Sequence, residues 1–194
     1  MIADSSARAD FVAADLISQA EHDEMASAVL VTDSQELAKA VEIQLSMQVQ
    51  HTTHSDRVAV ALKGAQSALV LVDDLAVAVD FSNAYGPEHL EIHTRNASQL
   101  VQEITNAGAI FVGDYSPVSL GDYSAGSNHV LPTAGQALFS SGLGSYTFLR
   151  PQQVIEYSKQ ALSDVASGIR LLADDEDLPA HGDAVDIRFN TEDN

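Results

Sequence analysis

Hydrophobic residues follow two different spacings along the first two thirds of the chain. Short uninterrupted runs are typical of buried β-strands, and they occur at 27–32, 67–72, 90–93 and 109–112. Hydrophobic positions that recur every three or four residues indicate helices, at 9–22, 35–48, 58–63, 75–85 and 97–106. This alternation predicts an α/β fold: an incomplete, Rossmann-like, mainly parallel sheet with helices on both faces.

The pattern changes after the last of these strands. Residues 113–144 are rich in glycine and serine and show little periodicity, which predicts a long irregular segment. A helical pattern resumes after Pro151, runs to about residue 173 and is followed by a short tail. We therefore expect a partial α/β domain over 1–143 and a C-terminal helical appendage over 144–194.

Composition narrows the class of protein. The 194 residues include 28 Asp and Glu against 9 Lys and Arg, a formal net charge of −19, and 45% are hydrophobic. The basic residues are scattered, so nucleic acid is not an expected partner. No apolar run is long enough to cross a bilayer and no secretory signal is visible, so we expect a cytoplasmic protein with no membrane partner.

The acidity itself is ambiguous. A solvated acidic surface accounts for it most simply, and salt adaptation or attraction of a cationic ligand are the alternatives. The chain has no cysteine, which excludes thiolate metal sites and cysteine nucleophiles. It also lacks GxGxxG and GxxxxGK[ST] motifs. Either it does not hold a nucleotide in the usual way, or the first half of its α/β unit is missing.

Two pairs of residues have spacings that are compatible with metal binding or proton transfer. Gln19 and His22 lie three apart on the first predicted helix, so one face could present both to a metal ion, although solvated helix ends often look the same. Glu88 and His89 follow a Gly-Pro turn, where an adjacent carboxylate and imidazole suit proton transfer. An exposed loop pair is the alternative.

Other candidates are single residues. Asp122, in the glycine-rich segment, could bind a metal or an ammonium group, and His129 could bind substrate; ordinary turn chemistry would also place them there. His181, near Glu176 in the tail, could ligate a metal across a subunit contact or face water. His93 is expected on the solvent side of its strand.

The order of these segments resembles one family. GPEHLEI (86–92), AGAIFVGDYSPVSLGDYSAGSNHVLPT (107–133) and SSGL (140–143) closely resemble motifs of histidinol dehydrogenase, as do QAEHD (19–23) and ADDEDLPAHGDAVDIR (173–188). The resemblance implies a zinc-dependent homodimer that oxidises L-histidinol to L-histidine through the aldehyde, with two NAD, at the end of histidine biosynthesis.

The resemblance also assigns roles to residues. It implies that Glu88 and His89 transfer protons and that His181 reaches the site from the partner subunit. The implied zinc ligands are Gln19, His22, Asp122 and His181. The implied substrate contacts are Gln19, His22, His89, Asp122, His129, Glu176 and His181. Residues that bind NAD are unknown, because the family's N-terminal half, which carries most of them, is missing.

The chain therefore looks like the C-terminal portion of such an enzyme, inactive alone if the cofactor site is essential. It departs from the family at Leu138, where arginine is frequent, and at Asp177, where glycine is usual. The alternative is a non-catalytic truncated paralogue that binds zinc or acts as an interaction module. A metal-dependent hydrolase could use the same ligands without NAD, but it would not explain the 121–133 motif.

Overall fold

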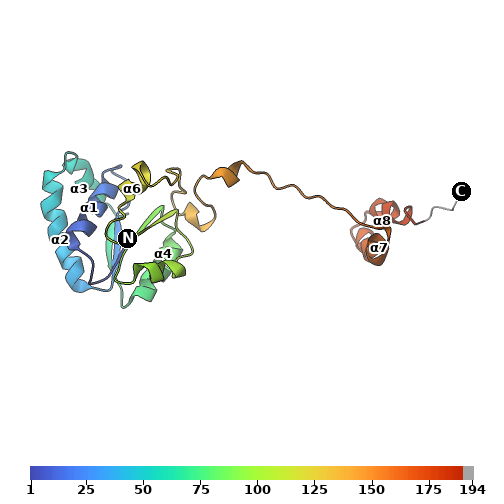
Figure 1. The fold of residues 1–194 in the computed structure, drawn as a ribbon, viewed down its shortest axis with the longest axis horizontal. Coiled ribbons are helices and arrows are strands. Elements are labelled where there is room, and N and C mark those ends of the chain that lie inside the picture. The colour runs from blue at the N-terminus through green and yellow to red at the C-terminus, as the bar shows by residue number, and fades with distance from the viewer. Residues whose placement is uncertain (190–194) are drawn as a thin grey trace. The chain divides into compact units, whose positions relative to one another are not determined.

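The computed structural model describes residues 1–189 of the chain (Figure 1). Contacts divide the chain into two compact units, the first formed by Met1–Phe148 and the second beginning at Leu149. Among the described residues, no helix combines the length and the apolar character that crossing a membrane requires.

The first unit is built on a parallel sheet of five strands in the order β3-β2-β1-β4-β5. The strands are β1 (Ile2–Ala3), β2 (Val29–Thr32), β3 (Ala68–Leu71), β4 (His89–His93) and β5 (Ala109–Val112). All neighbouring pairs are parallel, and Ile2 lies between Val31 and Ile92 at the centre of the sheet. The predicted α/β class is confirmed.

Helices cover both faces of this sheet (Figure 1). On one face lie α1 (Ala9–Ala20), α2 (Gln35–Gln48) and α3 (Ser55–Lys63), and on the other lie α4 (Leu75–Tyr85) and α5 (Ala97–Leu100). Side chains of successive strand residues point to opposite faces, so Ala3 and Leu30 join the first core while Ile2 and Val31 join the second. The sheet therefore holds two separate hydrophobic layers.

Several elements differ from the sequence prediction. The two-residue strand β1 is too short to give a periodic signal. The strand at 67–72 was predicted to be buried, but β3 is an edge strand paired only with β2, and Leu71 is 51% exposed. The helix predicted over 97–106 stops at Leu100, continues as the 3-10 helix Val101–Glu103 and ends there.

The segment predicted to be irregular contains two short helical elements, α6 (Val118–Tyr123) and the 3-10 helix Gln136–Leu138. A further 3-10 helix, Ser145–Phe148, lies just after it. Pro117 immediately precedes α6, a position where its fixed φ suits helix entry. Helix α6 carries Asp122, one of the predicted site residues.

The second unit is a pair of helices, α7 (Lys159–Asp175) and α8 (Pro179–Asp186). The helical pattern predicted α7 from about Pro151, but the helix starts only at Lys159, where the hydroxyl of Ser158 accepts a hydrogen bond from the Ala161 N–H. Helix α8 was not predicted. Arg170 of α7 pairs with Asp183 (2.6 Å) and Asp186 (3.1 Å) of α8, and these exposed ion pairs add only modest stability.

The turn between α7 and α8 contains Asp177, a position where the resemblance implies a glycine. The Leu178 N–H donates to the Ala173 carbonyl (2.8 Å) and the Asp177 N–H donates to the Asp174 carbonyl (3.2 Å). This pair of hydrogen bonds defines a Schellman cap. This cap places Asp177 in the left-handed region, at φ 56°. Glycine adopts that conformation without a steric cost, which accounts for the family's glycine.

We expect Asp177→Gly to raise the unfolding free energy of the second unit by about 0.5–1 kcal/mol, because it relieves the left-handed backbone. Urea denaturation followed by far-UV circular dichroism measures the change. Ala166→Gly, within α7, is the control and should lower stability by about 1 kcal/mol. An equal loss in both variants would contradict the Schellman assignment.

Candidate active site

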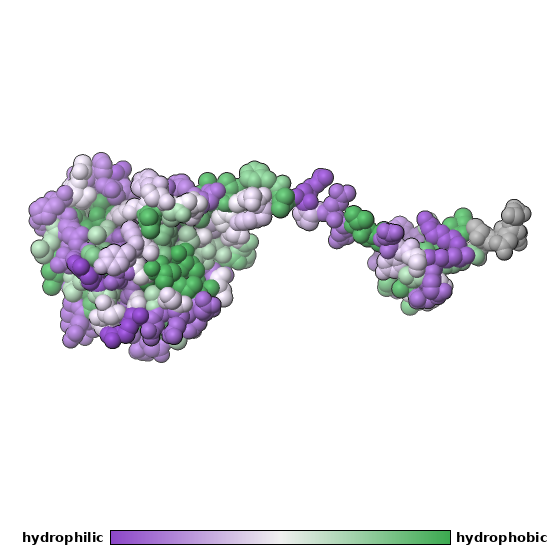
Figure 2. Space-filling view, in the orientation of Figure 1, coloured by the Kyte–Doolittle hydropathy of each residue, from purple (hydrophilic) through white to green (hydrophobic). Residues whose placement is uncertain are grey.

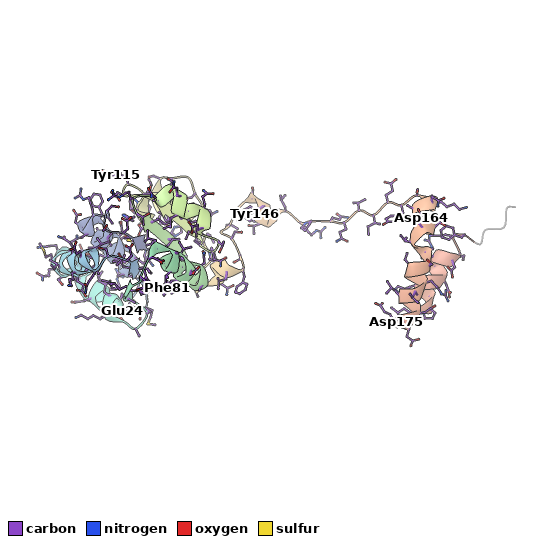
Figure 3. All side chains as sticks on the ribbon, turned by 90° about the horizontal axis from the view of Figure 1, so that it is seen from below. Glu24, Phe81, Tyr115, Tyr146, Asp164 and Asp175 are labelled. Carbon is purple, nitrogen blue, oxygen red and sulfur yellow. The ribbon has the colours of Figure 1, made fainter. Side chains whose placement is uncertain are left out.

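A cleft of about 760 Å³ opens at the amino-terminal ends of β1, β2 and β4. Its wall is formed by the ends of α1 and α4, the start of β4, helix α6 and the loop after it. Phe81, labelled in Figure 3, stacks on Tyr85 in this wall, with ring centroids 5.9 Å apart. Six of the predicted site residues line the cleft: Gln19, His22, Glu88, His89, Asp122 and His129.

Gln19 and His22 reach the cleft from the end of α1. The predicted helix extended to residue 22, but α1 ends at Ala20, and the His22 N–H bonds to the Gln19 carbonyl at 3.4 Å in the turn that follows. Ala20 is fully buried, which anchors the end of the helix. The two side chains are therefore brought together by a helix end and a turn, and not by a shared helical face.

Glu88 and His89 enter the cleft from the turn between α4 and β4. Gly86 ends α4 in the left-handed conformation, and Pro87 leads directly into the strand. Burial is the main cause that lowers the pKa of His89; the carboxylates of Glu88 and Asp122 oppose it, while His22 and His129 add to it. His89 is therefore neutral at neutral pH and able to accept a proton.

One polar atom of the cleft lacks a hydrogen-bond partner, and one carboxylate is largely shielded from solvent. The Nδ1 atom of His89 is buried and has no hydrogen-bond partner within residues 1–189. Asp122 is only 10% exposed through its side chain, and its Oδ1 atom contacts Nδ1 of His129 at 2.9 Å. Asp122 is therefore a largely desolvated carboxylate that faces the cleft, and its one side-chain partner, His129, is itself 71% exposed.

The electrostatics of the cleft favour cations. The carboxyl-terminal ends of α1 and α4, which carry partial negative charge, both contribute to its wall. Glu88 and Asp122 add two carboxylates. Nucleotides in parallel α/β sheets bind at the opposite edge, beyond the carboxyl ends of the strands. The cleft thus suits a metal ion or an ammonium group better than a phosphate.

A second polar group lies between α1 and β4. Asp15 of α1 and Glu91 and His93 of β4 offer ligand atoms that all lie within 4.8 Å of one another. His93 was predicted to face solvent, but it is 2% exposed, because α1 covers the face of β4 on which Glu91 and His93 both lie. Sequence reasoning missed this group, although two polar residues alternating with Leu90 and Ile92 in a strand were a usable signal.

Burial perturbs all three of these groups. It raises the pKa of Asp15 to about 6. It also raises the pKa of Glu91 to about 7, assisted by Asp15 and opposed by the Met1 amino group and the Val118 N–H. It lowers the pKa of His93, against the effect of Asp114. Near neutral pH the group therefore holds less charge than its composition suggests.

As the pH rises, a Glu91→Gln variant should gain unfolding free energy relative to the wild type. Both proteins are measured in the presence of a chelator, so that neither contains a bound metal ion. Below pH 4.5 Glu91 is protonated in the folded and the unfolded state, so the substitution changes little. Between pH 4.5 and about pH 7, Glu91 stays protonated in the folded chain but ionises in the unfolded chain, so the unfolding free energy of the wild type falls. Glutamine does not ionise, so the variant does not lose this stability. The expected gain at pH 7.5 is about 1–3 kcal/mol.

Urea denaturation at pH 4.5, 6 and 7.5 measures this gain. Glu42→Gln, at an exposed position of α2, is the matched control and should show a difference that is independent of pH. A pH-independent difference for Glu91→Gln as well would show that its carboxyl is solvated in the folded chain.

Glu176 and His181 belong to the second unit. Glu176 caps the end of α7 and His181 lies in α8, and both are exposed. Sequence analysis placed His181 in a short C-terminal tail, and the structure places it in helix α8.

A neutral histidine beside carboxylates and an amide, in a cation-favouring cleft of a parallel α/β domain, is typical of an enzyme that uses acid–base chemistry. Comparison with known proteins defines the family. The model of the family described as histidinol dehydrogenase matches residues 1–189, and the chain belongs to this family.

Relatives and a solved structure agree with this assignment. The chain is 58% identical over 189 residues to a histidinol dehydrogenase from Corynebacterium glutamicum and 60% identical to one from Leifsonia xyli subsp. xyli. The crystal structure of histidinol dehydrogenase from Elizabethkingia anophelis matches with a TM-score of 0.88 and 35% identity. Each match covers 97% of this chain but only 43% of the other protein, so the chain spans less than half the length of these relatives.

Proposed function

We propose that this chain provides the zinc-binding and proton-transfer part of a histidinol dehydrogenase, which oxidises L-histidinol to L-histidine through the aldehyde with two NAD. The observation that carries this proposal is the gathering of six residues, from α1, β4, α6 and the loop after α6, in one cleft of a chain from this family. The spacing of these residues along the sequence does not by itself predict that they line one cleft.

The cleft fits a zinc ion. Gln19, His22 and Asp122 offer oxygen and nitrogen donors, the surrounding helix ends favour positive charge, and Asp122 is a desolvated carboxylate with one exposed partner. These three residues would hold the ion, and His181 of a second subunit would complete the set. When bound, zinc would anchor the imidazole and amino nitrogens of the substrate.

The chain's own residues would move the protons. In the first oxidation the imidazole of His89 takes the hydroxyl proton as a hydride leaves the adjacent carbon for NAD, which gives the aldehyde. In the second oxidation, the carboxylate of Glu88 takes a proton from a water molecule as the oxygen of that water adds to the aldehyde carbon. A second hydride then leaves for NAD and the carboxylate product forms. His129 and Glu176 would contact the substrate.

The second unit suggests how a dimer would form. Several large hydrophobic residues of this unit are not buried: Ile155 is 79%, Val165 is 41% and Leu172 is 64% exposed. Figure 2 shows such hydrophobic residues, in green, among polar ones on this unit. An apolar face of this kind suits a second copy of the chain, which would deliver His181.

One observation favours an alternative. The cleft lies at the edge of the sheet opposite to the usual nucleotide position. A zinc-binding protein without NAD turnover, or an interaction module, would have the same fold. Its distinguishing property would be zinc binding without dehydrogenase activity.

Zinc content and histidinol-dependent formation of NADH test these proposals. We expect His22→Ala and Asp122→Ala each to lower the zinc content by one ion per chain, with the Corynebacterium glutamicum relative as the active control. Zinc binding without NADH formation would support the non-catalytic alternative for this chain alone. Zinc content that neither substitution changes would overturn the assignment of the ligands.

Gly108 offers a further test, because it holds the turn that carries Glu88. The Gly108 N–H donates to the Pro87 carbonyl at 2.9 Å, and a Cβ atom at Gly108 would lie 2.6 Å from the backbone oxygen of Glu88. At the equivalent position of a full-length relative, Gly108→Ala should lower kcat about 100-fold by displacing the Glu88–His89 pair, while the protein stays folded. Gly168→Ala, which meets nothing within 4 Å, should leave kcat unchanged. Equal activities would show that the turn tolerates the added methyl group.

A further inference from the structure

The group formed by Asp15, Glu91 and His93 takes no part in the proposed reaction. Its three ligand atoms lie within 4.8 Å of one another, and it is the one such group of histidine and acidic residues within residues 1–189. Two carboxylates and an imidazole form an oxygen and nitrogen donor set that divalent first-row metals accept.

The histidine of this group lacks partners on both sides of its ring. The side chain of His93 is 1% exposed, and neither Nδ1 nor Nε2 has a hydrogen-bond partner among the described residues. Nε2 points towards Asp15, with 3.7 Å to its Oδ2 atom, and Nδ1 lies 3.6 Å from Oδ1 of Asp114. Both distances exceed a hydrogen bond, so the ring is buried without compensation.

We propose that Asp15, Glu91 and His93 bind a second divalent cation, of the Zn²⁺ or Mn²⁺ class, distinct from the one held by Gln19, His22 and Asp122. Nε2 of His93 is the nitrogen ligand, because it is the ring atom on the side of Asp15. Asp114 then lies on the Nδ1 side, where metal-bound histidines usually donate their other ring N–H to a carboxylate.

The surroundings of the group support this assignment. Oε1 of Glu91 accepts a hydrogen bond from the Val118 N–H at 3.2 Å, which fixes the carboxylate and leaves Oε2 for the ion. Asp15 and Glu91 both line the cleft, so a cation has an entry path and room for water ligands.

The ion would connect two elements of the active site. Asp15 lies on α1, which carries Gln19, and Glu91 and His93 lie on β4, which begins at His89. A cation between them would fix the zinc-binding end of α1 relative to the proton-transfer pair.

Binding of Mn²⁺ to the chain, followed by electron paramagnetic resonance and by the rise in Tm, tests the proposal. The measurement is made in the His22→Ala background, which removes the other site without touching this one. We expect one Mn²⁺ per chain and a rise in Tm. His93→Gln and Asp15→Asn should each weaken binding at least 10-fold, and Asp114→Asn, which keeps all three ligands, should weaken it by about 10- to 100-fold.

Equal Mn²⁺ affinity in the Asp15→Asn, Asp114→Asn and parent chains would overturn the proposal, even if His93→Gln failed to fold. Loss of all Mn²⁺ binding in His22→Ala alone would also overturn it. Failure here is distinguishable from failure of the proposed function, because dehydrogenase activity and zinc binding at Gln19, His22 and Asp122 are measured separately.

Discussion

A His89→Asn variant of a full-length relative should lose about 10²–10⁴-fold in kcat for the first oxidation step, whereas Glu88→Gln should lose mainly the second. The difference follows from the proposed roles, because proton removal from the alcohol needs the neutral imidazole, while the attack of water on the aldehyde needs the carboxylate. The two steps are separated by assaying NADH formation from the alcohol and from the aldehyde as independent substrates.

The matched control is His51→Asn, an exposed histidine of the 3-10 helix Val49–His51, which should leave both rates unchanged. Zinc content should stay at the wild-type level in all three variants, so that a lost ion does not imitate a lost proton acceptor. Equal losses of the two steps in Glu88→Gln would contradict a role confined to water activation.

Mixing two inactive variants should restore activity if the site is shared between subunits. His22→Ala and His181→Ala each remove one zinc ligand and should each be inactive in a full-length relative. A mixed dimer contains one site with both histidines intact, so random exchange of subunits should recover about a quarter of the wild-type activity. The measurement is NADH formation after joint unfolding and refolding of the two variants.

Two controls make the result interpretable. Refolding each variant alone should recover nothing, and native mass spectrometry should show the mixed dimer. Mixed dimers without activity would show that all zinc ligands come from one chain, which would remove the role proposed for the exposed face of the second unit.

The success of the sequence prediction depended on how far apart the interacting residues lie. Helix α2 could be predicted from its own periodicity, with Asp33 or Ser34 as its cap, because a cap and the N–H that it accepts from are only a few residues apart. In the structure the cap is Ser34, which accepts from the Leu37 N–H. Strand β1 could not, because two residues have no period and its position at the centre of the sheet depends on pairing with Val31 and Ile92. Helix α8 was missed although Pro179 at its first turn is a recognised start signal.

The site shows the same limit. The six site residues of the cleft come from α1, β4, α6 and the turns and loop beside them, and local spacing gave only weak reasons to group them. The prediction that they share one site followed from the resemblance to the family, because the family's motifs assign these residues to a single site. The family motifs assign no role to Asp15, Glu91 or His93. That these three side chains lie close together is therefore apparent only from the folded chain.

The open edges of the sheet have a practical consequence for handling the protein. Within residues 1–189, β3 is paired on one side only and β5 likewise, and each leaves a row of backbone donors and acceptors unpaired. Leu71, 51% exposed, adds an apolar side chain at the β3 edge. Such edges recruit further strands and so promote aggregation. Purification at low concentration, with light scattering before every assay, therefore guards against mistaking self-association through the sheet edges for dimerisation through α7 and α8.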